Sequence, residues 1–394
     1  MTRTLSRRAF LQRTGFVGCS LAASPLVTPV TFAATPWDTR LVVIILRGGM
    51  DGLDVVRPYG DPTFKALRPG LGGGPAQGAH DLDGFYALHP ALEPLMRMWG
   101  KGQLGFVQAV STPYRDKRSH FDGQDLLEAG TETIAGVRDG WLNRMLQAVP
   151  GVTAQTAYAI GRSDMRLLQG SAEVANWSPE AELGLSPQAQ QLMDLVTEDD
   201  AAIHAAWQEA QLLASLEEQD AIAQGKQRKG AHVRIAEFAA ERLRDEARIA
   251  AFSLNGWDTH KAQANALPRA LNQLSETLIT LRKKTGRDVW DKTAVVALTE
   301  FGRTARENGS GGTDHGTGGL MVMAGGAVQG GRVHGDWPGL QSGDLYQNRD
   351  LMPTRDVRAH VAWIMRGLMG LDIATLEGSV FPGLDMGDNP GLLL

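Results

Sequence analysis

The sequence predicts an α/β protein, folded as an α/β/α sandwich around a mainly parallel sheet. Three observations support this fold class. Short, continuous apolar runs, typical of strands that are buried on both faces, recur along the chain. Segments with helical periodicity lie between these runs. Clusters of Asp, His, Glu and Ser follow the ends of the runs, which is where open α/β sheets bind their ligands.

The predicted strands are apolar segments at residues 41–46, 104–110, 248–254, 293–299 and 320–324. Helical patterns occupy residues 91–100, 122–129, 186–195, 201–223, 232–247, 262–284 and 354–368. Because strands alternate with helices, we expect helices on both faces of the sheet. We predict one domain over residues 34–394, with a polar helical insertion at 170–230.

Composition and charge narrow the classes of function. The 394 residues carry a net charge of −5, and the first 33 include four arginines and no acidic residue, which leaves −9 on the remainder. This balance argues against a nucleic-acid binder, because such a protein needs a basic face. The only cysteine, Cys19, lies within those 33 residues, so the rest of the chain has no disulfide and no thiolate metal site.

Residues 1–33 have the features of a twin-arginine signal peptide. Arg7 and Arg8 are followed by an apolar pair, then by a weakly apolar stretch and a small-residue cleavage site ending at Ala33. The stretch falls short of the roughly 20 apolar residues of a stable membrane span. We therefore predict recognition by the twin-arginine translocation machinery, no stable transmembrane span after cleavage, and a periplasmic or secreted product. Two alternatives are a disordered basic N-terminus and a lipoprotein anchored through Cys19.

Potential metal ligands follow three of the predicted strands. Asp51 follows the first strand, Asp258 and His260 follow the third, and Asp314 and His315 follow a Gly-rich loop beyond the fourth. Because Asp258 and His260 are two residues apart, an extended backbone points both side chains to the same side. Carboxylate oxygens and imidazole nitrogens bind divalent metals, so the pattern predicts a metal centre at this edge of the sheet.

Three further residues at this edge are candidates for catalysis. Ser119 precedes a predicted helix, whose N-terminus favours an anion, and Glu300 and Arg303 follow the fourth strand. Structural alternatives remain open for these segments. An Asp after a strand is commonly a turn residue, and Ser119 with Asp122 is a variant of the capping box. His120 fits a helix-capping region as well as it fits a site.

The full set of motifs resembles the bacterial family catalogued as domain of unknown function 1501, over nearly all of the chain after residue 33. The motifs that carry the resemblance are Arg47-Gly48-Gly49-Met50-Asp51-Gly52-Leu53, Arg118-Ser119-His120-Phe121-Asp122, Trp257-Asp258-Thr259-His260, Glu300-Phe301-Gly302-Arg303, Gly312-Thr313-Asp314-His315-Gly316 and residues 331–340. That family is grouped with the alkaline phosphatase superfamily, which includes sulfatases. The resemblance implies an alkaline phosphatase-like sandwich with one or two divalent ions, either zinc, manganese or calcium.

By this resemblance, Asp51 is similar to the superfamily's first metal-binding Asp, and Asp258 with His260 to its mid-chain pair. Residues 314–316 resemble its Asp-His-Gly segment. A further histidine normally completes the site, and His334, in a Gly-rich loop, is the candidate for it.

The resemblance implies an exported, metal-dependent hydrolase that acts on a small phosphate or sulfate ester. Ser119 stands where the nucleophile is expected, and Glu300 and Arg303 would orient ligands or bind the substrate anion. The alternative is a catalytically inactive alkaline phosphatase-like protein that serves in binding or assembly in the periplasm. His360, on a helical pattern, is expected to be packed and not to be a ligand.

Overall fold

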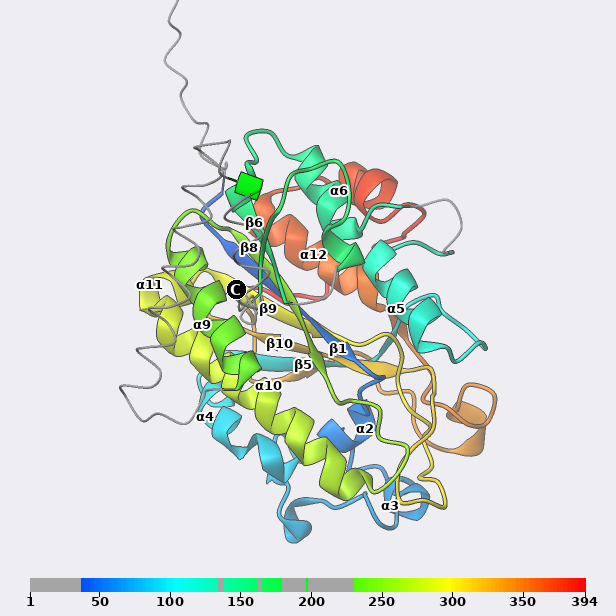
Figure 1. Cartoon of the computed structure of the whole chain (residues 1–394). Helices are drawn as coiled ribbons and strands as arrows, with labels where there is room; N and C mark the ends of the chain where they lie inside the picture. The colour runs from blue at the N-terminus through cyan, green and yellow to red at the C-terminus, as the bar shows by residue number, and fades with distance from the viewer. Residues whose placement is uncertain (1–36, 134–137, 162–164, 179–195, 198–229) are drawn as a thin grey trace, which may run out of the picture. The chain divides into compact units, whose positions relative to one another are not determined.

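A nine-stranded sheet organises the described part of the chain (Figure 1). The structure, a computed structural model, describes residues 37–133, 138–161, 165–178, 196–197 and 230–394. The predicted signal peptide at 1–33 lies outside the described residues, as does most of the predicted insertion at 170–230. The helical patterns at 186–195 and 201–223 also fall outside them.

All five apolar runs predicted as strands belong to this sheet. They form β1 (Arg40–Arg47), β5 (Leu104–Ser111), β8 (Ile249–Asn255), β9 (Thr293–Leu298) and β10 (Gly319–Ala324). In space their order is β5-β10-β9-β1-β8. β1 is parallel to β8 and β9, whereas β10 is antiparallel to both β5 and β9. The mainly parallel sheet is therefore confirmed, with β10 as the reversed strand.

Shorter strands extend the sheet beyond the predicted ones. On one side they are β6 (Ala157–Ile160) and β7 (Ala175–Trp177), and beside β5 they are β11 (Val333–His334) and β12 (Arg355–Asp356). A separate small sheet contains β2 (Val56–Arg57), β3 (His80–Asp81) and β4 (Ala87–Leu88). Runs this short carry little periodic signal. β7 lies near the start of the predicted insertion and pairs with β6 as a parallel strand.

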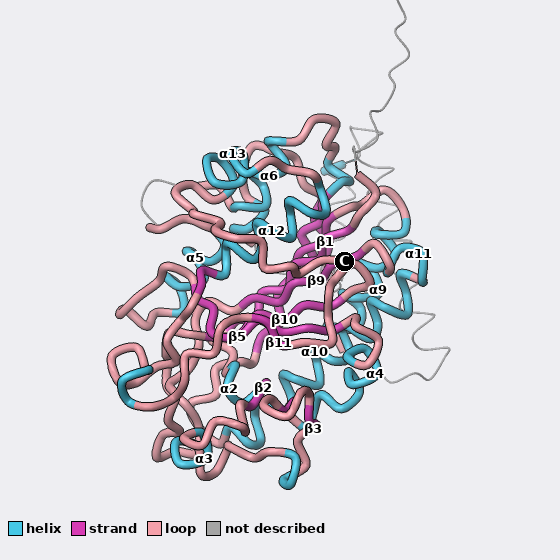
Figure 2. The backbone as a smooth tube through the Cα atoms, turned by 180° about the vertical axis from the view of Figure 1, so that it is seen from behind, coloured by secondary structure: helices cyan, strands magenta, loops and turns pink. Residues whose placement is uncertain are grey.

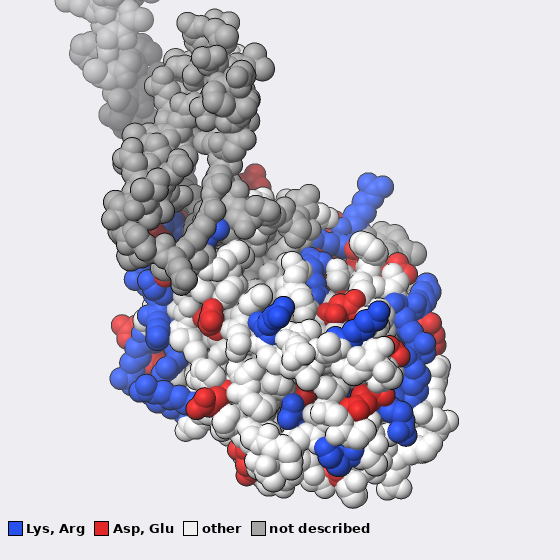
Figure 3. Space-filling model, turned by 60° about the horizontal axis from the view of Figure 1, so that its bottom comes forward, with Lys and Arg blue, Asp and Glu red and all other residues white. Residues whose placement is uncertain are grey.

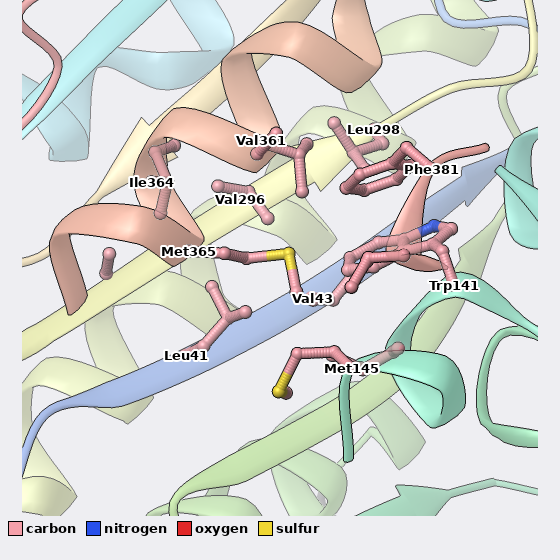
Figure 4. Close-up of a cluster of buried hydrophobic side chains, with 14 of the residues drawn as sticks. Leu41, Val43, Trp141, Met145, Val296, Leu298, Val361, Ile364, Met365 and Phe381 are labelled. Carbon is pink, nitrogen blue, oxygen red and sulfur yellow. The ribbon is translucent and has the colours of Figure 1, made fainter. Parts of the chain in front are cut away.

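Helices cover both faces of the sheet, which confirms the α/β/α sandwich. Alternate residues of β1 point to opposite faces, so Val43 lies in one apolar core and Ile44 in the other. The first core packs against α5, α6 and α12, and Figure 4 shows Trp141 and Met365 there beside Val43. The second core packs against α4, α9 and α10. The bounds are α4 (Met96–Trp99), α5 (His120–Ala129), α6 (Trp141–Ala148), α9 (Ala231–Arg244), α10 (Gln263–Thr285) and α12 (Val357–Met369).

The predicted helix at 91–100 is instead a 3₁₀ helix, Pro90–Leu95, followed by the short α4. Pro94 explains the difference, because proline lacks an N–H and disfavours the α conformation in the residue before it. The remaining short helices are α2 (Gly52–Val55), α3 (Phe64–Leu67), α11 (Arg287–Trp290) and α13 (Ile373–Thr375), with 3₁₀ helices at Pro75–Gln77, Ala154–Thr156, Arg166–Leu168 and Ser342–Asp344 and a π-helical turn at Leu376–Val380.

The loops that carry the candidate site residues lie at one edge of the sheet, because β10 runs antiparallel to its neighbours. The strands β1, β5, β8 and β9 all end at this edge, and the antiparallel β10 begins there at Gly319. The irregular segment 299–318 therefore starts and finishes at the same edge. Figure 2 shows long loops, in pink, beside β5 and α5 on this side.

Two further expectations concern a membrane span and nucleic-acid binding. Among the described helices, none combines the length and the apolar character needed to cross a bilayer. On the face visible in Figure 3, Lys and Arg are interspersed with Asp and Glu. The expectation that the chain does not bind nucleic acid stays a prediction.

Candidate metal centre

Three loops at the carboxyl edge of the sheet bring four side chains together. His120 begins α5, which follows β5, while Asp258 and His260 follow β8, and His315 lies between β9 and β10. The loops pack closely because glycines face them. A Cβ on Gly48 would stand 2.5 Å from the backbone nitrogen of Asp258, so only glycine allows this approach.

The potential ligand atoms of His120, Asp258 and His315 all lie within 4.8 Å of one another, and His260 contacts two of these three residues. The Nε2 atom of His260 is 2.9 Å from Nε2 of His315 and 3.1 Å from Oδ1 of Asp258. Nε2 of His315 and Nε2 of His120 each lie 3.5 Å from an oxygen of Asp258. Tetrahedral zinc with bonds of about 2.0–2.2 Å holds its donor atoms roughly 3.3 Å apart. The observed separations therefore fit a single ion bound among these groups.

Hydrogen bonds at Nδ1 turn each histidine's Nε2 toward the shared point. Nδ1 of His315 faces the carbonyl oxygen of Arg118 at 2.8 Å, and Nδ1 of His260 faces Oδ1 of Asp314 at 3.2 Å. Both acceptors require a proton on Nδ1, because a carbonyl or an ionised carboxylate has none to donate. With both rings neutral, two Nε2 lone pairs face each other at 2.9 Å, an arrangement that a metal ion or a proton between them stabilises.

Glu300 orients the third histidine, His120. Oε1 of Glu300 lies 2.7 Å from Nδ1 of His120 and also accepts bonds from Gln124 and from the Gly48 N–H. Nε2 of His120 is buried and lacks a hydrogen-bond partner. Burial by itself raises the pKa of Glu300, but these hydrogen bonds outweigh burial and lower it, so the carboxylate is ionised. In return, the bond with Glu300 raises the pKa of His120 despite its partial burial.

The side chain of Arg303 joins the loops that follow β1, β8 and β9, and it orients Asp258. Its guanidinium donates to Oδ1 of Asp258 at 2.6 Å and to four backbone carbonyls, those of Gly48, Gly49, Trp257 and Thr313. Burial raises the pKa of Asp258, but Arg303 outweighs it and lowers that pKa. Because the Arg303 side chain is 0% exposed, it cannot contact a substrate. Of its two expected roles, only the orientation of a ligand matches this position.

The chemistry of the donor set favours zinc among the three metals expected. Three imidazole nitrogens and one carboxylate oxygen suit zinc, whereas calcium takes oxygen ligands. The hydrogen bond from each histidine's Nδ1 to an oxygen is the second shell that metal-ligating histidines usually have. The residues present therefore fit a zinc ion bound by His120, Asp258, His260 and His315.

Three of the predicted metal ligands lie outside this cluster, and two of them, Asp51 and His334, have partners elsewhere. Asp51 is 1% exposed, and its two oxygens accept bonds from Arg68 at 2.6 and 3.0 Å. Asp51 is therefore a buried ion-pair partner of Arg68, and its role as a ligand stays a prediction. His334 pairs beside Val107 of β5, four residues before Ser111 ends that strand, which is roughly 13 Å away along a strand. Its Nε2 bonds to the carbonyl oxygen of Gln329 instead.

The remaining predicted residues have other partners. Asp314 supports His260 through Nδ1 and is itself held by Asn308. Ser119 caps α5, accepting a bond of 3.4 Å from the Asp122 N–H. His360 is 2% exposed and packed in α12, as expected.

From the sequence, His120 fits either a helix-capping region or a functional site. In the structure it lies at the start of α5 and also beside Asp258 and His315. It is the first residue of α5, directly after the Ser119 cap, and its ring lies 4.3 Å from that of His315. The available signal was its place in the same segment after β5 as Ser119. Nothing in the sequence indicates that Glu300, 180 residues further along, is its hydrogen-bond partner.

The fold and the site define an α/β/α protein with a cluster of histidine and aspartate side chains, a candidate metal site, at the carboxyl edge of its sheet. The family model described as "Protein of unknown function (DUF1501)" matches residues 109–363, and the chain belongs to this family. This confirms the resemblance found in the motifs. No curated protein matches the sequence.

Several solved structures are distantly similar. The lipoteichoic acid synthase LtaP from Listeria monocytogenes is 8% identical with a TM-score of 0.32, and the match covers 68% of this chain and 57% of that one. A protein in the alkaline phosphatase superfamily from Vibrio parahaemolyticus is 10% identical with a TM-score of 0.33, and the match covers 85% of this chain and 68% of that one. The C-terminal periplasmic domain of EcEptC from Escherichia coli, in complex with Zn, is 11% identical with a TM-score of 0.33, and the match covers 73% of each chain. Activity is therefore argued from the chain's own residues.

Proposed function

We propose that this chain binds one zinc ion through His120, Asp258, His260 and His315 and hydrolyses phosphate or sulfate esters beside it. The observation that carries the proposal is the hydrogen-bonding pattern of the three histidines. Each places Nδ1 on an oxygen acceptor and turns Nε2 toward Asp258 and its neighbours. A histidine that only filled space would have no reason to share this pattern with two others.

The centre is open enough for a substrate to reach. The side chains of Asp258 and His260 are 47% and 38% exposed, whereas Glu300 and Arg303 behind them are buried. Ser119 lies at the N-terminus of the ten-residue α5, where backbone N–H groups favour an anion. Lys117 and Arg118, both exposed, precede it and supply positive charge for a phosphate or sulfate group.

In the proposed reaction Ser119 is the nucleophile. Its Oγ attacks the phosphorus or sulfur atom of the ester, and the bond to the alcohol breaks, so the alcohol leaves with the serine proton. Water then hydrolyses the seryl ester, which releases phosphate or sulfate and restores Ser119. A bound zinc ion supplies Lewis-acid stabilisation of the negative charge. Glu300 and Arg303 hold His120 and Asp258 in place throughout.

Metal analysis tests the binding step. We expect one zinc ion per chain after purification from zinc-replete cells, and weaker retention of manganese and calcium in parallel reconstitutions. His120→Ala, His315→Ala and Asp258→Ala should each lose the metal. His232→Ala is the matched control, because His232 pairs with Glu276 on the surface of α9 and α10. A metal-free wild type under these conditions would overturn the proposal.

A substrate screen tests the catalytic step. Aryl phosphates, phosphodiesters and aryl sulfates are assayed with added zinc, manganese or calcium. We expect turnover that disappears in Ser119→Ala and persists in Ser171→Ala, an exposed serine in a turn. Turnover that survives both Ser119→Ala and chelation would come from a contaminant and would refute catalysis at this site.

A second candidate function is a metal-binding protein without turnover. The specific observation in its favour is Asp51, whose oxygens are taken by Arg68 and are not available to a second ion. Stoichiometric zinc together with an empty substrate screen would favour this candidate.

Export through the twin-arginine pathway is part of the proposal. It is supported by the motif around Arg7 and Arg8. Fractionation of cells should find the wild type in the periplasm or the medium. The double variant Arg7→Lys, Arg8→Lys should remain in the cytoplasm, as should the wild type in cells that lack the translocase. Equal export of both forms would contradict this route.

A further inference from the structure

A buried glutamine, Gln263, lies beneath the two segments that carry most of the proposed ligands. It is the first residue of α10 and follows Ala262, which has a positive φ of 46°. Its side chain has no exposed surface. An unpaired amide at such a depth is costly, so its partners decide what it does.

The amide of Gln263 has hydrogen-bond partners at both ends. Nε2 donates to Asp51 at 2.6 Å and to Asp54 at 2.7 Å. Because ionised carboxylates only accept, this end must be the NH₂ group, and Oε1 must face the other way. There it accepts bonds of 2.8 Å from the hydroxyls of Thr259 and Thr313.

The two threonines are placed among the ligands. Thr259 lies between Asp258 and His260, and Thr313 directly precedes the segment 314–315. Both are buried, at 1% and 0% exposure. One oxygen atom therefore connects the middle of one ligand segment with the start of the other. A backbone bond from the Thr313 N–H to the Thr259 carbonyl, 3.2 Å long, runs beside this connection.

The two carboxylates that accept from Gln263 are themselves held by ion pairs with arginines. Asp51 pairs with Arg68, whose guanidinium also donates to the carbonyls of Thr304 and Ala305. Asp54 pairs with Arg57 at 2.8 Å. Since both arginines are buried, the NH₂ group of Gln263 has little freedom to move.

We propose that Gln263 is a positioning residue for the zinc centre: it sets the separation between the segments 258–260 and 313–315. Asp51 acts through it and through its own contact of 3.3 Å with the Thr313 hydroxyl. This inference rests on the proposed zinc site. It gives Asp51, at the end of the loop after β1, a role at the centre that needs no contact with the ion. Loss of outer partners typically weakens metal binding by about 10–100-fold, and we expect that range here.

Paired threonine variants test the inference. Thr259→Val and Thr313→Val keep the shape of the side chain and remove the hydroxyl, whereas Thr259→Ser and Thr313→Ser keep the hydroxyl. We expect zinc binding about 10–100-fold weaker in the valine variants and within a few-fold of wild type in the serine variants. Zinc affinity is measured by competition with a chromophoric chelator.

Two further readouts separate positioning from general stability. The visible spectrum of the cobalt-substituted protein reports coordination geometry, and it should change in the valine variants only. Thermal unfolding of the metal-free protein shows whether the fold itself has been weakened. If Gln263→Met folds, adding Thr259→Val to it should cause no further loss of zinc affinity, because both changes break the same connection.

The outcomes distinguish this inference from the proposed function. A wild type that binds no zinc refutes the zinc site itself. A wild type that binds zinc, with valine and serine variants equal to it in affinity and in cobalt spectrum, refutes the positioning role alone. Weaker zinc binding that is fully matched by a lower unfolding temperature of the metal-free valine variants, with an unchanged cobalt spectrum, also refutes it.

Discussion

Replacing Glu300 by glutamine is the most direct test of how the centre is built. The variant Glu300→Gln keeps the shape of the side chain and removes its charge. Oε1 of the amide can still accept from His120, Gln124 and the Gly48 N–H. The new NH₂ group replaces Oε2, which lies 3.1 Å from the hydroxyl of Thr299 and can donate to it. We therefore expect the variant to fold.

The expected loss is in metal affinity. The bond of 2.7 Å from His120 to Glu300 is charge-assisted, and bonds of this kind are about twice as strong as neutral ones. Second-shell changes of this sort typically cost about 10–100-fold in metal affinity. That corresponds to about 1.4–2.7 kcal/mol of binding free energy.

The change should also alter the pH dependence of zinc binding. Glu300 raises the pKa of His120, so protons compete with zinc for Nε2 as the pH falls through that raised value. Zinc is therefore retained above this pKa and lost below it. Without the carboxylate charge the pKa of His120 should fall, so the variant binds zinc more weakly at neutral pH but loses it over a more acidic range.

Isothermal titration with zinc between pH 5 and pH 8 (about two units around the ordinary histidine pKa) measures both effects. Glu128→Gln is the matched control, since Glu128 is a buried carboxylate that pairs with Arg47 and contacts none of the three histidines. An affinity and pH profile in Glu300→Gln equal to those of the wild type would show that Glu300 does not act on His120 as argued.

Three further predictions concern stability. Zinc at 100 times its Kd should stabilise the fold by about 2.7 kcal/mol, so chelation should lower the unfolding temperature of the wild type but not of His315→Ala. Arg303→Met leaves buried carbonyls without donors, each worth about 1–3 kcal/mol, so denaturant unfolding should reveal a loss of about 3 kcal/mol or more; a loss below 1 kcal/mol would contradict its role in joining the loops. Burial lowers the pKa of His360 to about 4, so the folded state binds fewer protons, and about 3 kcal/mol of stability present above pH 6.5 should be lost as the pH falls toward 4. His360→Gln should flatten this part of the profile of unfolding free energy against pH, and an unchanged slope would contradict the assignment.

The main strands could be predicted from the sequence because burial on both faces leaves a direct mark. Residues of β1 and β9 face two apolar cores, so almost every position must be apolar. The short strands β6 and β7 could not be predicted, because three or four residues show no clear period of their own and are ordered by pairing with their neighbours. Nor does the sequence give the direction of β10, which depends on where the segment 299–318 returns to the sheet.

The site was predictable to the extent that it lies at strand ends. Asp258, His260 and His315 are at the predicted edge because β8 and β9 end there. The ion pair of Asp51 could not be predicted from its position after a strand. Its partner Arg68 directly follows α3, and nothing in the spacing marks that arginine as buried rather than exposed.

The pairing of Asp51 with Arg68 also bears on how many ions the centre holds. Burial opposes the charge of Asp51, yet Arg68 outweighs it and lowers its pKa, so the carboxylate is ionised. A cation placed beside it would have to displace a guanidinium that makes two bonds to Asp51 and others to backbone carbonyls. Removing one partner of such a buried pair typically costs about 3–5 kcal/mol. The fixed positive charge of Arg68 thus stands where a second ion would otherwise neutralise Asp51, which is why we expect a single ion at the histidine cluster.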